Sequence, residues 1–234
     1  QSPYCSPLKQ GHATFSGMGL TLIISLILCL IVFWPAPTYY NGPKSDHFNG
    51  KTFSNQERKD RNLFQLIKWL WTRHPEKWPQ WVDITTSIPP KRSQELRITS
   101  INHASFLIQW NNLNILTDPI YSERASPFSS YGPKRVHEPG IKFEDLPPID
   151  YVLISHNHYD HLDLPTLKKL VEKDHPRFIT GLGNDRYLEK EGIQNVIALD
   201  WWETSHGFTF VPAEHFSARW YNDRNRTLWG GFLK

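Results

Sequence analysis

The residues that could do chemistry are most concentrated at positions 155–163, where three histidines and two carboxylates fall together. His156 and His158 are two positions apart, so on an extended backbone their side chains point the same way and can bind one metal ion. Asp160 and His161 follow after the chain has begun to turn, so they can face a second ion beside the first. Imidazole and carboxylate ligands suit zinc, and iron and manganese accept them too. The alternative is a surface loop that is simply rich in histidine.

Two regular elements are expected to hold this cluster in place. The apolar run at 149–154 predicts a buried strand. Leucines recur at helical spacing over 164–173, and Pro165 suits the first turn of a helix. The cluster therefore lies on a loop between the end of a strand and the start of a helix, where metal-binding and catalytic residues tend to collect.

The spacing of His156, His158, Asp160 and His161 resembles the signature of the metallo-β-lactamase superfamily of hydrolases. Other stretches, over about residues 45–234, resemble the branch that contains N-acyl-phosphatidylethanolamine phospholipase D and its bacterial relatives. These stretches are Gly50–Asn55, Asn102–Ile108, Ile115–Pro119, Val211–His215 and Leu228–Gly231.

The resemblance implies a site with two zinc ions when it is complete. His215, after a predicted strand, would join His156 and His158 on the first ion, which leaves an open position for water. Asp160 and His161 match the ligands of the second ion and are the residues assigned to catalysis. The bridging aspartate and the last histidine of the family would lie beyond Lys234, so the chain is expected to carry about the first half of the catalytic sandwich.

Two further residues are candidates for supporting this site. Asp118, at a strand end before Pro119, could orient a ligand histidine through a hydrogen bond, or could be an Asp-Pro turn residue. His103 could lie at the edge of the site, or could be a buried structural histidine. His47 belongs to a family-like stretch, Asp46–Gly50; it could approach the active site, but such a histidine is more often a surface or turn residue.

The fold class expected is α/β, with the first half of a metallo-β-lactamase αββα sandwich, preceded by an N-terminal transmembrane helix. Three strands form a meander, with a turn at Asn111 and Asn112 between the second and the third. A loop-rich stretch follows at 121–148. Strands and helices then alternate, which favours a layered architecture. The expected strands are 95–101, 105–110, 113–118, 149–154, 177–180, 196–199 and 207–212, and the helices are 164–173 and 185–191.

Composition and length divide the 234 residues into three parts. They are a membrane anchor at 1–40, a linker with a Trp-rich amphipathic helix at 41–94, and the hydrolase domain at 95–234. The 26 basic and 23 acidic residues give a net charge of +3, so a nucleic acid is not expected as a partner. With only two cysteines there is no disulfide framework.

Positions 18–34 contain no charged residue and predict a single-pass membrane anchor near the lower length limit. A cleaved signal peptide and a buried core helix are the alternatives, and the side of the membrane is not decided by the flanking lysines. A second apolar stretch at 63–81 predicts an amphipathic helix. We expect this helix to pack on the domain as a lid; the alternative is an interfacial helix that touches lipid headgroups.

The resemblance implies hydrolysis through a metal-bound hydroxide, without a serine or cysteine nucleophile. Together with the predicted anchor it suggests a phosphodiesterase that acts on a phospholipid such as N-acyl phosphatidylethanolamine. One alternative is a membrane-tethered hydrolase of a soluble ester, lactone or phosphodiester. The other is a non-catalytic scaffold with a degenerate fold. The oligomeric state, the acyl-chain preference and the identity of the metal are not determined by the sequence.

Overall fold

The structure is a computed structural model that describes residues 35–55 and 63–234. The described residues from Pro37 onward form one compact unit. Most of the predicted anchor at 1–40 and both cysteines lie outside the described residues. In the part of the chain that the structure describes, no helix combines the length and the apolar character needed to cross a bilayer.

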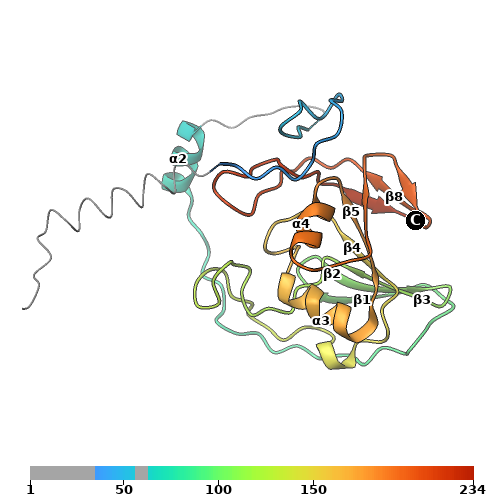
Figure 1. The fold of residues 1–234 in the computed structure, drawn as a ribbon. Helices are drawn as coiled ribbons and strands as arrows, with labels where there is room; N and C mark the ends of the chain where they lie inside the picture. The colour runs from blue at the N-terminus through green and yellow to red at the C-terminus, as the bar shows by residue number, and fades with distance from the viewer. Residues whose placement is uncertain (1–34, 56–62) are drawn as a thin grey trace, which may run out of the picture. The chain divides into compact units, whose positions relative to one another are not determined.

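The larger sheet has six strands in the order β1-β2-β3-β4-β5-β6 (Figure 1). They are β1 (Arg97–Asn102), β2 (Ser105–Trp110), β3 (Leu113–Thr117), β4 (Tyr151–Ile154), β5 (Arg177–Gly181) and β6 (Val196–Leu199). The strands β1, β2 and β3 form an antiparallel meander, whereas β3 to β6 run parallel. The predicted meander and the alternation after it are confirmed, with element ends shifted by one or two residues.

One face of this sheet is covered by helices. They are α3 (Leu164–Asp174) and α4 (Asn184–Lys190), and a 3₁₀ turn at Phe143–Asp145 precedes β4. The helix α3 has a proline in its first turn and buries Leu167 and Leu170 on one stripe. These leucines pack with Leu116, Val152 and Phe178 of the sheet in the first core.

The opposite face is covered by a smaller sheet, whose strands are β7 (Thr204–Ser205), β8 (Phe208–Val211) and β9 (Gly231–Leu233). The strand β4 alternates between the two sides: Val152 and Ile154 enter the first core, and Leu153 enters the second. The described chain is thus layered as helices, larger sheet and smaller sheet. This α/β layering agrees with part of the expected sandwich.

The helix α2 (Leu63–Thr72) forms within the predicted amphipathic stretch, but it does not pack as expected. Its apolar side chains are exposed, with Phe64 at 74% and Trp71 at 89% of their accessible surface. The expectation of a packed lid is therefore wrong for the described residues. The physical reason is that α3 and α4 on one side, and the smaller sheet on the other, already bury the apolar faces of the larger sheet.

Candidate metal centre

The predicted site residues lie at one end of the larger sheet, where several segments leave it. The strands β3 and β4 are parallel neighbours with Thr117 opposite Leu153, so Asp118 and Ser155 emerge side by side. The strand β1 runs in the same direction as β3, because each is antiparallel to β2. The turn at His103, which follows β1, therefore lies at the same end of the sheet.

The side chains of His156, His158 and His215 converge, although His215 comes from the loop after β8. The Nε2 atom of His156 lies 2.8 Å from Nδ1 of His158. The Nε2 atom of His215 lies 3.0 Å and 3.2 Å from those two nitrogen atoms. Three nitrogens bound to a tetrahedral zinc at about 2.0–2.1 Å are separated by about 3.3 Å. The donor set therefore fits one zinc ion.

A second group that could hold a metal adjoins the first and consists of His103, Asp160 and His161. The Nε2 atoms of His103 and His161 lie 3.3 Å and 3.8 Å from Oδ2 of Asp160. The rings of His156 and His161 have centroids only 4.1 Å apart. The structure thus brings together every predicted ligand, and it places the exposed His103 beside Asp160 and His161, where it could contribute to a second metal site.

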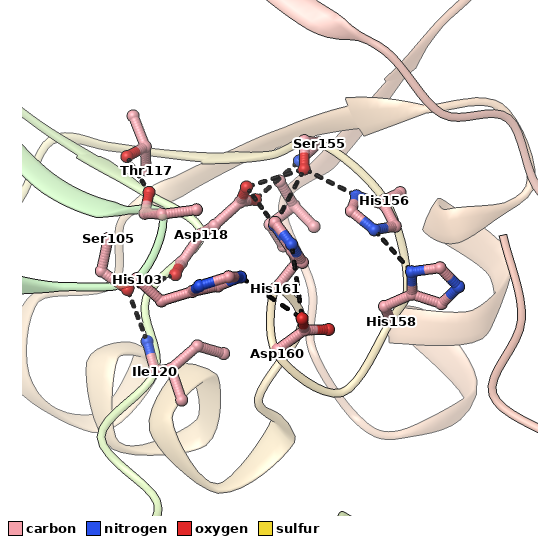
Figure 2. Close-up of polar contacts among 12 residues, drawn as sticks. His103, Ser105, Thr117, Asp118, Ile120, Ser155, His156, His158, Asp160 and His161 are labelled. Atoms are coloured by element: carbon pink, nitrogen blue, oxygen red, sulfur yellow. Dashed lines mark hydrogen bonds and ion pairs between the residues drawn. The ribbon is translucent and has the colours of Figure 1, made fainter. Parts of the chain in front are cut away.

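A network behind the ligands connects Asp118 to both groups (Figure 2). The carboxylate of Asp118 accepts hydrogen bonds from the backbone N–H and the hydroxyl of Ser155, both at 2.7 Å, and from Nδ1 of His161 at 2.9 Å. Asp118 is buried and has a positive φ of 35°, a conformation that is uncommon outside glycine. Ser105 supports this turn by donating to the Asp118 carbonyl oxygen.

Comparison with protein families agrees with this geometry. The model of the beta-lactamase superfamily domain matches residues 113–233, which include the strand end at Asp118, the histidine-rich loop and His215. The chain belongs to this superfamily.

Relatives in this superfamily include proteins of known and unknown activity. An uncharacterized protein of Mycobacterium tuberculosis is 34% identical over 183 residues, which cover 74% of this chain and 49% of the relative. The N-acyl-phosphatidylethanolamine-hydrolyzing phospholipase D 1 of Caenorhabditis elegans is 34% identical, over 57% of this chain and 42% of the relative. The mitochondrial N-acyl-phosphatidylethanolamine-hydrolyzing phospholipase D of Saccharomyces cerevisiae is 38% identical, over 53% and 28%. The chain spans about half, or less, of the length of these relatives.

Solved structures resemble the chain more distantly. A metallo hydrolase of Ignicoccus hospitalis is 20% identical, with a TM-score of 0.42 and a coverage of 56% of this chain and 53% of that one. A likeness at this level carries no argument about function.

The hydrogen bonds of His156 and His161 determine which nitrogen of each ring is free to bind a metal. An ionised Asp118 can only accept, so the single hydroxyl hydrogen of Ser155 goes to it, and Ser155 must accept from Nδ1–H of His156 at 2.9 Å. This leaves the lone pair on Nε2 of His156, which faces His158 and His215. By the same logic His161 donates from Nδ1 to Asp118, and its Nε2 faces Asp160.

The environment favours the neutral form of His156, His158 and His215. Burial, followed by the charges of neighbouring histidines, lowers the pKa of His156 to about 2. Burial and then the charge of His215 lower the pKa of His158 to about 4, and burial lowers the pKa of His215. For His161, burial also acts to lower the pKa, but the hydrogen bond and charge of Asp118 raise it above its ordinary value. Neutral imidazoles are the form that binds metal.

These shifts predict that the metal-free chain loses stability in acid. Because the folded pKa of His156 is about 2 and its ordinary value is 6.5, the unfolded state binds more protons below pH 6.5. With metal removed by a chelator, the free energy of unfolding should fall by up to about 1.4 kcal/mol per pH unit from this residue as the pH drops from 6.5 to 5. His161 opposes this trend because its pKa is raised. Urea unfolding at each pH measures the slope, and the variant His156→Asn should have a shallower slope; equal slopes would contradict the assignment.

Sequence reasoning missed two residues that hold the histidine-rich loop. Ser155 links Asp118 to His156, and its position directly before the first histidine was the signal available. Arg219 donates from Nη1 to the carbonyl oxygens of Asn157 and Leu162, both at 2.8 Å, and its guanidinium lies 3.9 Å from the ring centroid of Tyr159. No local pattern marks Arg219, because its partners are 57 and 62 residues away.

Asp223 and His206 lie outside both ligand groups. Asp223 is buried in a loop and accepts from the backbone N–H groups of Arg219 and Trp220, so it serves the turn and not the site. His206 lies in the turn before β8 with a positive φ of 52°.

A cleft of about 390 Å³ opens beside the second group of ligands. Its lining includes His103 and Asp160 together with Lys134, Arg135 and His137 from the predicted loop-rich stretch. Lys134 pairs with Glu123 at 2.6 Å. The cleft therefore opens directly next to the candidate metal centre.

Proposed function

We propose that the complete protein is a metal-dependent phosphodiesterase that hydrolyses a membrane phospholipid such as N-acyl phosphatidylethanolamine. The observation that carries this proposal is the convergence of two adjoining ligand groups on one sheet end, one with His156, His158 and His215 and the other with His103, Asp160 and His161. Two relatives named as N-acyl-phosphatidylethanolamine-hydrolyzing phospholipases D support the choice of substrate.

Two zinc ions would supply the Lewis acidity that activates water and stabilises negative charge on phosphoryl oxygens; iron and manganese are alternatives. The residues of this chain would position the metal ligands and a water molecule for this reaction. Asp118 and Ser155 hold the histidine rings so that their lone pairs face inward. Asp160 is half-exposed beside the cleft, where it can accept a proton or a hydrogen bond from a water molecule.

The cleft offers partial charge complementarity to a phosphodiester. Lys134 and Arg135 line it together with two acidic residues, Glu123, which pairs with Lys134, and Asp160. If Asp160 binds a metal ion, Arg135 would be left as the positive charge that attracts the single negative charge of a phosphodiester.

The protein is also proposed to bind a membrane, through a single-pass anchor at 18–34 and through α2. The uncharged run at 18–34 and the exposed aromatic side chains of α2 support this proposal. Lys68 within α2 and Arg73 just after it could meet anionic headgroups, and Arg73 lies 5.0 Å from the ring centroid of Trp69. Tryptophan and basic residues together are typical of interfacial helices.

The experiment that tests the function compares substrates with the full-length protein. N-acyl phosphatidylethanolamine in mixed micelles, phosphatidylethanolamine and the soluble diester bis(p-nitrophenyl) phosphate are each assayed before and after chelation and after zinc is returned. The proposal predicts zinc-dependent release of phosphatidate with a preference for the N-acylated lipid. Metal-dependent turnover of the soluble diester alone, unchanged after deletion of residues 1–40, would favour a merely tethered hydrolase. A protein that binds less than one metal ion per chain would favour the scaffold.

The exposed face of α2 gives a separate prediction. In a chain that lacks residues 1–40, the variant Trp71→Ser should lower partitioning onto anionic lipid vesicles by roughly 10-fold, because full burial of a large apolar side chain contributes about 1.5–3 kcal/mol and an interface buries only part of it. Co-sedimentation with vesicles measures the change. Ile88→Ser, which removes another exposed apolar side chain outside α2, is the control. Equal effects of both variants would contradict a specific role for the helix.

A further inference from the structure

The loop that carries His215 has no regular secondary structure after β8 ends at Val211. A metal ligand on an irregular loop needs a partner that holds its backbone in place, because a shift of the backbone moves the ligand atom with it. His156 and His158, in contrast, follow directly from the buried strand β4. The position of His215 must therefore be determined by contacts from elsewhere in the chain.

Those contacts come from Asn55, which lies 160 residues earlier. Its side-chain amide pairs with the backbone of His215 on both sides: Nδ2 donates to the carbonyl oxygen at 2.9 Å, and Oδ1 accepts from the N–H at 3.2 Å. The indole Nε1–H of Trp229 donates to the same Oδ1 at 3.0 Å and to the carbonyl oxygen of Ala213 at 2.9 Å. Asn55 and Trp229 thus fix the loop on both sides of Glu214.

Asn55 can do this because residues 45–55, here called the strap, are anchored independently. Phe48 and Phe53 are buried in the second core with Trp201 and Trp229. The backbone N–H of Phe53 also donates to the carbonyl oxygen of Asn225 at 2.8 Å. The strap therefore approaches the His215 loop as a packed segment and not as a free end.

His47 fastens the other end of the strap. Its Nδ1 lies 2.6 Å from Oδ1 of Asp46, and its Nε2 lies 2.7 Å from Oδ1 of Asp200. Its ring stacks on Trp201 with centroids 4.5 Å apart. His47 lies in a bend, as expected for a turn residue, but it is buried at 7% exposure, so the expectation of a surface position is wrong. A buried imidazole requires polar partners, and the carboxylates of Asp46 and Asp200 supply them.

We propose that Asn55 is a positioning residue for the candidate metal centre, which holds His215 in the geometry that completes the three-histidine group. The inference rests on the proposed function, because it assumes that His215 binds zinc. It gives a role to the Gly50–Asn55 stretch, which carries no metal ligand of its own. The strap thus fixes the position of His215 through the side-chain amide of Asn55.

The test uses the full chain, purified in detergent, and a competition titration with a chromophoric chelator to measure affinity for the first equivalent of zinc. Partners that orient metal ligands are worth about 10–100-fold in affinity, so Asn55→Ala should weaken binding by that factor. Asn55→Asp keeps the acceptor for His215 N–H but sets a carboxylate oxygen against the His215 carbonyl, so it should fall between the wild type and Asn55→Ala. Lys51→Ala, an exposed change on the same strap, should bind as the wild type.

A double-mutant cycle separates positioning from a general structural role. If Asn55 acts through His215, adding Asn55→Ala to His215→Ala should cause no further loss of zinc affinity. An equal loss in both backgrounds, or wild-type affinity in Asn55→Ala beside a weakened His215→Ala, would overturn this inference alone. Wild-type affinity in His215→Ala would overturn the proposed function as well. Urea unfolding of the metal-free variants confirms that each is folded. If Asn55→Ala does not fold, Asn55→Asp is used in its place.

Discussion

Replacement of His215 by alanine is expected to lower the affinity of the chain for zinc by about 100-fold or more. The estimate follows from zinc sites with four ligands, whose apparent binding free energy of about 10–16 kcal/mol corresponds to roughly 2.5–4 kcal/mol for each ligand. Removal of His215 leaves only His156 and His158 at the first position. Two neutral imidazoles cannot close a tetrahedral site with one open position for water.

The measurement is the same chelator competition, together with the rise in melting temperature that zinc causes. Ligand binding stabilises the folded state by about 2.7 kcal/mol when the free zinc concentration is 100 times the dissociation constant, and this increment should largely vanish in His215→Ala at the same concentration. His74→Ala, which removes an exposed histidine of the loop after α2, is the matched control. If His74→Ala and His215→Ala bind zinc equally, the three-histidine group is not the zinc site.

The second large effect is expected for Asp118→Asn, which should reduce zinc affinity at the second group by about 10–100-fold. The substitution retains the shape of the side chain, and asparagine tolerates the positive φ at this position. It replaces a carboxylate that accepts from His161 and Ser155 with an amide whose N–H₂ faces those same donors. His161 then loses the partner that directs its Nε2 toward Asp160.

The second equivalent of zinc in the titration measures this change. Ser155→Ala separates the two connections of Asp118, because it breaks the link to His156 and leaves the direct hydrogen bond to His161. It should therefore weaken the first equivalent more than the second. Asp145→Asn, a charge change in the 3₁₀ turn at the far end of the β3–β4 connection, is the control. A second equivalent that binds Asp118→Asn as tightly as the wild type would show that Asp118 serves only the turn.

Several features of the site could be predicted from the sequence because they depend on neighbours along the chain. The spacing of His156 and His158 places both on one side of an extended segment, and the apolar run before them marks a buried strand. The strands and the helices after the metal loop were predictable for the same reason. Local patterns also identified His215, but only because a family places a histidine after such a strand.

The remaining contacts were decided by the tertiary structure. His103 contacts Asp160 because the β1–β2 turn and the metal loop lie at the same end of the larger sheet. The order of strands in that sheet cannot be predicted from the local spacing of residues. Asn55 meets His215 across 160 residues because Phe48 and Phe53 are buried in the second core. The same reasoning applies to α2: its amphipathic pattern predicted a helix, but whether the apolar face is covered depends on which surfaces other elements already occupy. The sequence by itself thus determined most of the candidate ligands and the elements that carry them, whereas packing between distant segments decided that His103 lies beside them and which side chains hold them in place.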